Sequence, residues 1–289
     1  MLNVATLTDV DDAWWNVALA LALATAGSQT LRRVWGTTLV APAAWWILSA
    51  LAIGVAEAML AAGAIEPASL AESLIRYGAA VSLFCPLTAV LGAKRPQDRG
   101  WQWVVLSLWV VLLVPAGQAL ASSAGQRLEL YGAWRALLAG FIGMGLLNYL
   151  PTRYWLSSLL AAAGQTFVLS DVLFSADAVG NRVAIGLGLL LAAAVTGALN
   201  AAAQRRQRSQ QPATTARWLK FRDGWGAFWA LRVMQRINQT AELSHWPVRL
   251  EWNGFVPLDP ADAASPVAFT PPIEVAIDQS LDNVLRRFE

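Results

Sequence analysis

Two acidic residues stand inside long apolar runs, where a charged side chain is unusual. Glu57 lies near the end of one run, and Asp171 lies late in another. A charge in the hydrocarbon of a bilayer is costly, so such a residue is a functional hypothesis by default. Arg76 and Arg135 are the candidate partners of either acid. The four residues predict one of two arrangements: a polar vestibule for a cation, a proton or a small solute, or paired structural carboxylates near a membrane surface.

A second candidate site combines aromatic and cationic side chains after the last apolar run. Trp225, Trp229, Arg232 and Arg236 recur at spacings of three and four residues. That spacing places the rings and the guanidinium groups on one side of a helix. Two interpretations stay open. The helix lies on anionic lipid headgroups with its rings inserted, or it packs on its own small domain with the arginine stems covering the rings.

The sequence predicts no catalytic residue, no metal site and no cofactor. The chain of 289 residues has one histidine, His245, and one cysteine, Cys85, whereas a zinc or haem site needs several such ligands. Both lysines, Lys94 and Lys220, lie outside the apolar runs, so a Schiff base inside a helix bundle is not expected. The HExxH, GxSxG and phosphate-loop patterns are absent or out of context.

The composition indicates an integral membrane protein. Hydrophobic residues make up 56% of the chain, charged residues 14%, and the mean hydropathy is +0.46. Globular domains average about 25% charged residues, so this chain has too little charge to cover its apolar sequence in water. The net charge of +2 gives no indication of a nucleic-acid partner.

Seven apolar stretches approach the roughly 20 residues that a helix needs to cross the hydrocarbon layer. They are 13–31, 40–62, 77–93, 101–121, 134–150, 155–174 and 183–203. The first stretch contains a sequence that resembles a signal-peptidase site, 24–26. Acids precede it in place of the positive leader of a signal peptide, which favours a span that is retained.

The charges between the stretches predict an orientation. With seven crossings, one side of the membrane receives most of the cations: Arg32, Arg33, Lys94, Arg95, Arg99, Arg153, Arg205, Arg206 and Arg208. The other side receives mainly acids. Because an excess of Lys and Arg marks the cytoplasmic face, we expect the N-terminus outside and the C-terminus in the cytoplasm. The expected location is the plasma or inner membrane.

The last third of the chain predicts a small cytoplasmic α+β domain. Residues 1–203 form the seven-helix bundle in this interpretation, and 204–289 form the domain. Its expected parts are a linker at 204–215, a helix at 217–241 interrupted near 222–224, a hairpin turning at 253–254, a loop at 259–272 and an amphipathic helix at 278–288. The apolar face of that last helix docks either on the hairpin or on a partner.

Glycines in two of the apolar stretches predict close packing between helices. They are Gly140, Gly143, Gly145, Gly186 and Gly188. Small residues let helix backbones approach one another in a membrane.

Three classes of function follow. The first is a non-enzymatic component that anchors or organises a membrane complex, with the cytoplasmic domain as its contact surface for a protein partner. The second is a transporter or channel that uses Glu57 and Asp171, which requires both acids to share a water-accessible cavity. The third is a membrane-embedded enzyme acting on lipid, for which the sequence offers no evident pair of base and nucleophile.

Overall fold

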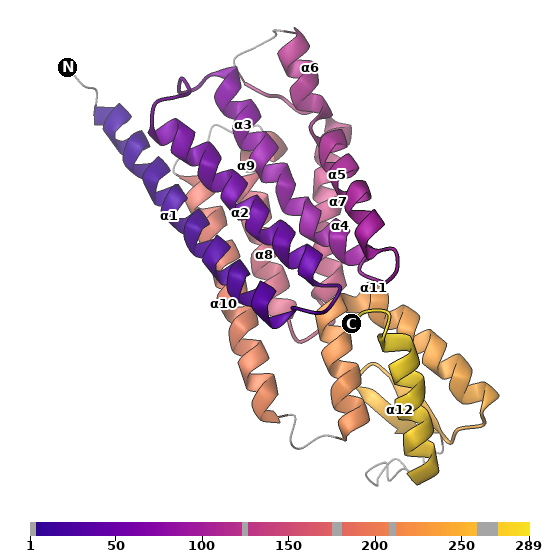
Figure 1. Cartoon of the computed structure of the whole chain (residues 1–289). Helices are drawn as coiled ribbons and strands as arrows, with labels where there is room; N and C mark the ends of the chain where they lie inside the picture. The colour runs from indigo at the N-terminus through magenta and orange to yellow at the C-terminus, as the bar shows by residue number, and fades with distance from the viewer. Residues whose placement is uncertain (1–3, 123–126, 175–180, 208–211, 259–270) are drawn as a thin grey trace.

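The protein is mostly helical and has one small two-stranded sheet. A computed structural model describes residues 4–122, 127–174, 181–207, 212–258 and 271–289. Most of the helices form an elongated bundle, and the C-terminal residues form a smaller body at one end of it (Figure 1). We refer to residues 212–258 and 271–289 as the C-terminal region.

Four helical segments of the described chain are long and apolar enough to cross a membrane. They are Val40–Ala61, Leu70–Leu91, Asp98–Ser122 and Arg182–Gln204. The length and composition of these segments indicate a membrane protein. Three other predicted spans, 13–31, 134–150 and 155–174, are helical and belong to the same bundle, but they are not among these four segments.

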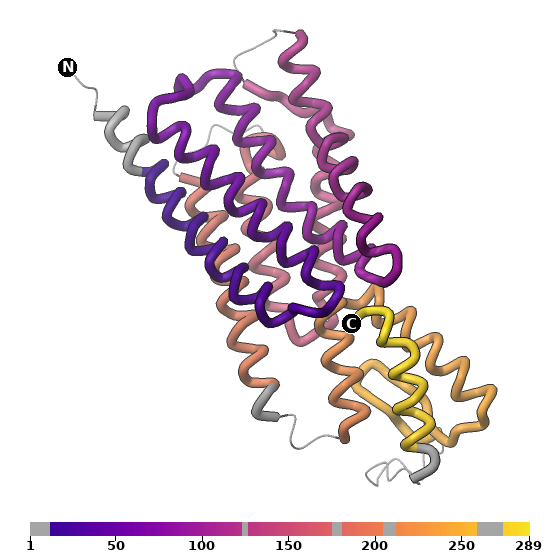
Figure 2. Tube along the Cα trace, viewed as in Figure 1, coloured from indigo at the N-terminus to yellow at the C-terminus, as the bar shows by residue number. Residues whose placement is uncertain are grey.

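The bundle is built from α1 to α10. In chain order these are α1 (Val4–Arg33), α2 (Val40–Ala61), α3 (Leu70–Val81), the 3₁₀ turn η1 (Ser82–Phe84), α4 (Cys85–Leu91), α5 (Asp98–Leu112), α6 (Val114–Ser122), α7 (Gly132–Tyr149), α8 (Trp155–Val168), α9 (Ser170–Phe174) and α10 (Arg182–Gln207). α1 begins at the end of the bundle farthest from the C-terminal region (Figure 1), and the coloured trace in Figure 2 follows α1 from there toward the C-terminal region. We call the end where α1 begins the far end.

Local features of the sequence explain where the third predicted span begins and where the fourth is interrupted. The third starts at Leu70 instead of residue 77, because Ser69 accepts a hydrogen bond from the Glu72 amide at 3.2 Å and so caps the helix. The fourth is divided at Leu113, two residues before Pro115. Proline has no N–H to donate and its ring crowds the preceding turn, so it interrupts a helix.

Close packing by glycine is found at one of the predicted glycines, Gly186, and at several that were not predicted, among them Gly164. A Cβ added to Gly186 on α10 would lie 2.9 Å from the Gly164 carbonyl oxygen on α8. The two backbones therefore touch. A Cβ at Gly145 would make ordinary contact with Leu87, at 3.6 Å. At Gly140, Gly143 and Gly188 it would meet no described heavy atom within 4 Å, so close packing was the wrong prediction for those three.

The C-terminal region contains two helices and a hairpin: α11 (Ala213–Leu243), β1 (Val248–Glu251), β2 (Gly254–Pro257) and α12 (Pro271–Leu285). The strands are antiparallel, and Glu251 pairs with Gly254. The two-residue turn is therefore 252–253, one residue earlier than predicted. The predicted end of the bundle, residue 203, falls inside α10. Most of the predicted loop, 259–270, lies outside the described residues.

The break in α11 is at Gly226, not at 222–224 as expected. Gly226 has φ +77° and ψ −179°, a conformation that a residue with a Cβ rarely adopts. The site is also sterically closed, because a Cβ there would lie 2.6 Å from the Asn148 side chain at the end of α7. Contact with the bundle therefore favours the break at Gly226 over one at Gly224, where a Cβ would make only ordinary contact with Leu39, at 3.6 Å.

Candidate functional site

Glu57 is enclosed at the far end of the bundle. Only 1% of its surface is exposed, and the same holds for Asn16 on α1. Asn16 Nδ2 donates a hydrogen bond of 2.8 Å to Glu57 Oε2. A carboxylate buried so deeply requires several donors, because an uncompensated charge in a low-dielectric interior is unstable.

Arg76 supplies most of that compensation. It extends from α3 and donates from Nε to Glu57 Oε1 at 2.8 Å and from Nη2 to Glu57 Oε2 at 3.1 Å. This two-point geometry is the strongest form of the arginine–carboxylate pair. Arg76 Nη1 also donates to Glu72, whose other oxygen accepts from the Ala68 amide at 2.6 Å. The guanidinium thus lies between two carboxylates.

Asn181 extends the same network to α10. It donates to Asn16 Oδ1 at 3.0 Å, and its own side-chain oxygen accepts from the Ala184 amide at 2.9 Å. The second bond is a helix N-cap. We call Asn16, Glu57, Glu72, Arg76 and Asn181 the far-end network. It ties α1, α2, α3 and the start of α10 together.

The other two residues of the predicted site, Asp171 and Arg135, are not among the described hydrogen-bond partners of Glu57. The Asp171 side chain is 65% exposed and its ion-pair partner is Arg182, at 3.9 Å. Arg135 lines a separate hollow, with Ala136, Ile142 and Thr166 among its neighbours. Glu57 and Asp171 therefore do not share either of the two surface hollows described here.

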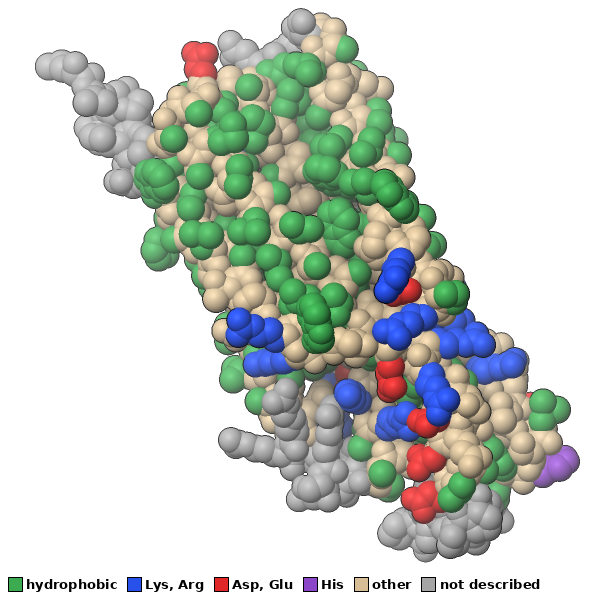
Figure 3. All heavy atoms as spheres, viewed as in Figure 1, with side chains coloured by type: hydrophobic (Ala, Val, Ile, Leu, Met, Phe, Trp, Pro, Cys, Tyr) green, Lys and Arg blue, Asp and Glu red, His purple; other side chains and the backbone are tan. Residues whose placement is uncertain are grey.

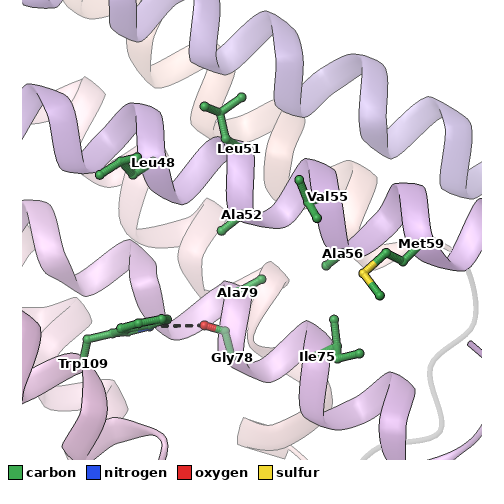
Figure 4. A pocket seen from close by; sticks show the side chains of 10 residues that line it. All are labelled: Leu48, Leu51, Ala52, Val55, Ala56, Met59, Ile75, Gly78, Ala79 and Trp109. Atoms are coloured by element: carbon green, nitrogen blue, oxygen red, sulfur yellow. Dashed lines mark hydrogen bonds between the residues drawn. The ribbon is translucent and has the colours of Figure 1, made fainter.

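The larger hollow is an apolar groove on the side of the bundle (Figure 4). Leu48, Leu51 and Val55 form one wall on α2, and Ile75 stands on α3 opposite them. Trp109 of α5 closes one end, where its indole N–H donates to the Gly78 carbonyl at 3.3 Å. Leu48, Leu51 and Val55 are 40% exposed or more. A groove lined in this way suits lipid chains and offers no polar group for a soluble ligand.

The aromatic residues of the second predicted site are inside the protein. Trp225 is 6% exposed and Trp229 is 5% exposed. Both rings pack against Phe288, with centroid distances of 5.8 and 5.1 Å. The interpretation with rings inserted in lipid is therefore corrected: α11 packs on its own region and on the bundle.

The two arginines of that site remain on the surface. Arg232 and Arg236 are exposed, and the Arg232 guanidinium lies over the Trp229 ring at 5.2 Å from its centroid. This is the stacked arrangement in which an arginine covers a buried ring.

The C-terminal region and the bundle share one hydrophobic core. Val90 and Ala93, at the end of α4, belong to the same buried cluster as Trp218, Trp229 and Phe288. The tail helix α12 contributes its apolar face to this cluster through Ile277, Leu281 and Leu285. Its apolar face is therefore covered within the chain, against α11 and the bundle.

Hydrogen bonds also join the C-terminal region to the end of the bundle. We call this contact, together with its buried cluster, the junction. Trp229 Nε1 donates to the Val90 carbonyl at 2.9 Å, and Trp225 Nε1 donates to Thr38 Oγ1 at 3.2 Å. The backbone takes part as well. The Thr38 amide donates to the Phe288 carbonyl at 3.0 Å, and the Arg95 amide donates to the Arg287 carbonyl at 2.7 Å.

A polar cluster lies beside the aromatic core of the junction. Asp223 is 2% exposed and accepts from Arg222 at 2.7 and 2.9 Å. Gln204 of α10 and Arg153 of the loop between α7 and α8 also approach Asp223, at 3.4 and 4.0 Å. At the end of α7, Asn148 Oδ1 accepts from the Phe228 amide at 3.0 Å, just after the break in α11.

Sequence reasoning missed several of these residues. Asn181 had a usable signal, since an asparagine directly before an apolar helix is a typical N-cap. Asn148 had a signal as well, as a polar side chain within the apolar stretch 134–150. Thr38 and Asp223 had none, because each has a partner distant in the chain. Thr38 and Trp225, for example, are 187 residues apart.

No group of three His, Cys, Asp or Glu side chains able to hold a metal ion occurs among the described residues. Comparison of the chain with known protein families, with curated proteins and with solved structures gave no match. Functional inference therefore rests on the geometry of the far-end network and of the junction.

Proposed function

We propose that this protein is a non-enzymatic component of a membrane complex that anchors or organises its partners through the C-terminal region. The observation that carries the proposal is the junction. A shared buried cluster and several hydrogen bonds, among them those of Thr38, Val90 and Arg95, hold the C-terminal region to the end of the bundle. A partner bound to such a region is held at a fixed position and orientation relative to the bilayer.

The proposal includes seven crossings, with the N-terminus outside and the C-terminal region in the cytoplasm of a plasma or inner membrane. The odd number of crossings is supported by the position of the first helix. α1 starts at the opposite end of the bundle from the C-terminal region (Figure 1). The orientation is supported by the cations. Lys and Arg side chains gather where the bundle meets the C-terminal region (Figure 3), and cations mark the cytoplasmic side.

The transporter alternative has less support. Every oxygen of Glu57 already accepts a hydrogen bond from Arg76 or Asn16, and Asp171 is an exposed residue paired with Arg182. Sites for transported ions are usually near the middle of the membrane, whereas Glu57 is four residues from the end of α2. A lipid-acting enzyme has no supporting constellation among the described residues.

Labelling of single cysteines tests the topology. In a Cys85→Ser background, Ser69→Cys reports on the loop at the far end and Ser244→Cys reports on the C-terminal region. On intact cells a membrane-impermeant maleimide should label the first variant only, and the second after permeabilisation. Labelling of both without permeabilisation would overturn the proposed topology.

Purification from native membranes in mild detergent tests the function. The full chain should retain a partner protein in constant proportion, and a chain that ends after Gln207 should lose it. Proteoliposomes of the full chain provide the opposing outcome. Solute or ion flux that Glu57→Gln abolishes, together with no retained partner, would replace the anchoring role by transport.

A further inference from the structure

Five cations at the junction make no ion pair with any described residue. We call Lys94, Arg95, Arg99, Arg232 and Arg287 the junction cations. Within the described part of the chain, the ion pairs use other arginines, and none of these five takes part in one. Unpaired like charges repel one another, so a surface that gathers them is suited to an anion.

The fold brings these residues together from three distant segments. Lys94 Nζ and Arg232 Cζ both lie over the Trp229 ring, 5.7 and 5.2 Å from its centroid. The hydrogen bond from the Arg95 amide to the Arg287 carbonyl sets the end of α12 beside the same loop. Trp229 is itself fixed by its bond to the Val90 carbonyl. The cations are therefore positioned by the junction core.

The neighbouring acids do not neutralise this surface. Asp98 precedes Arg99 in the first turn of α5, and Glu289 follows Phe288 at the end of the described chain. Glu289 lies 4.0 Å from Arg217, which also pairs with Asp282. Five cations against two acids leave a positive excess.

Among the junction cations, Lys94, Arg95 and Arg99 lie at the ends of helices long enough to cross a membrane, which is the depth of lipid headgroups. Lys94 and Arg95 lie between the segments Leu70–Leu91 and Asp98–Ser122, which are long and apolar enough to cross a membrane. Trp103 is 72% exposed and stands four residues after Arg99, so both face the same side of α5. Exposed tryptophan next to arginine is typical of the boundary between hydrocarbon and headgroups.

We infer that the junction cations bind the phosphate groups of anionic phospholipids in the cytoplasmic leaflet. Such lipids are attracted to clusters of Lys and Arg that lie directly cytoplasmic of a membrane helix. Here the buried Trp229 ring holds two of the cations in place, and the lipid phosphate supplies the counter-charge that the described residues do not. The inference rests on the proposed membrane topology but not on a partner protein.

Electron paramagnetic resonance of spin-labelled lipids tests this inference. The full chain is reconstituted in phosphatidylcholine bilayers that contain a trace of spin-labelled phosphatidylglycerol or of spin-labelled phosphatidylcholine. The motionally restricted fraction should favour phosphatidylglycerol several-fold. The variant Arg95→Gln/Arg99→Gln/Arg232→Gln should remove most of that preference, and so should 1 M NaCl, since salt screens charges at such distances.

A control variant with the same charge change keeps the test specific. Lys220→Gln/Arg236→Gln/Arg249→Gln removes three exposed cations of the C-terminal region outside the junction cations, and should leave the preference intact. An equal loss in both variants would reduce the effect to net charge and overturn the inference. The inference would also be overturned if inorganic phosphate abolished the preference for phosphatidylglycerol while chloride of the same ionic strength did not. The junction cations would then bind a soluble anion. No partner protein is present in this sample, so its result is independent of the anchoring role.

Discussion

The far-end network and the junction both hold separate helices together, but by different means. At the far end Arg76 and Asn16 bond to the buried carboxylate of Glu57, and Asn181 bonds in turn to Asn16. The buried hydrophobic cluster of this part of the bundle consists of Ala, Leu and Ile side chains. At the junction four large aromatic side chains, Phe221, Trp225, Trp229 and Phe288, form a core that hydrogen bonds then fix in register.

The surroundings explain this difference. Between helices in lipid the hydrophobic effect supplies no driving force, so association depends on close contact and on polar bonds. A region exposed to water gains stability from burying aromatic surface. We expect junction substitutions to cost more than substitutions in the bundle, and each prediction below tests that order.

The largest expected effect is that of Trp229→Ala. Removing a buried tryptophan costs about 3–5 kcal/mol, and this change also leaves the Val90 carbonyl without its donor. Thermal unfolding in mild detergent should show the loss. Hydrogen exchange should quicken at Thr38 and Arg95, whose amides bond to the end of α12. Trp35→Ala, at a side chain that is 75% exposed, serves as the control and should change neither quantity.

The second effect tests the break in α11. Gly226→Ala places a Cβ against Asn148 in a conformation that costs about 1–3 kcal/mol for a residue other than glycine. Exchange should quicken around Phe228, whose amide is capped by Asn148. Gly224→Ala is the matched control, because a Cβ there would meet Leu39 at an ordinary 3.6 Å. Equal destabilisation by both changes would contradict the importance of the break.

The third effect concerns packing in the bundle. Gly186→Ala brings a Cβ within 2.9 Å of the Gly164 carbonyl and within 2.9 Å of the Val168 amide nitrogen. Overpacking of this kind costs about 1–3 kcal/mol. Gly188→Ala, two residues along the same helix, meets no described atom within 4 Å. Unfolding midpoints of the pair, measured side by side, should fall for Gly186→Ala alone.

The smallest effect separates the two acids of the first predicted site. Glu57→Gln removes the charge that Arg76 and Asn16 compensate, and we expect a loss of about 1–2 kcal/mol. This is below the 3–5 kcal/mol typical of a broken buried pair, because the Arg76 side chain is 34% exposed and water can reach it. Asp171→Asn should cost less than about 0.5 kcal/mol, as exposed pairs do. If Asp171→Asn proved the more damaging change in the same unfolding assay, the assignment of Glu57 as the structural acid would be wrong.

Local pattern was sufficient for much of the fold. The hairpin and the apolar helix at 183–203 were predicted close to where they occur, and the tail helix was predicted but begins at Pro271 instead of residue 278. The predicted boundaries were wrong where a helix cap or a contact with a distant residue determines the actual boundary. Ser69 moved the start of α3, and Asn148 moved the break in α11 from 222–224 to Gly226.

The candidate sites were less predictable than the fold. The three- and four-residue spacing predicted Trp225, Trp229 and Arg232 on one side of a helix, but the break at Gly226 separates Trp225 from the other two. The spacing also left the surroundings open, since both lipid and a protein core suit such a side. The structure buries the rings and leaves the arginines at the surface. In the same way, Glu57 had two candidate partners in the sequence, and only the packing of α2 on α3 selected Arg76 over Arg135.

The sequence by itself determined which segments are apolar helices and where along the chain the cations gather. These properties depend on the composition and order of neighbouring residues, and on how such residues divide between oil and water. Only the tertiary structure decided which carboxylate meets which arginine, which glycine bends a helix and what covers the aromatic side of α11. Those outcomes depend on contacts between residues tens to hundreds of positions apart, and a helical period specifies the direction of a side chain but not its neighbour.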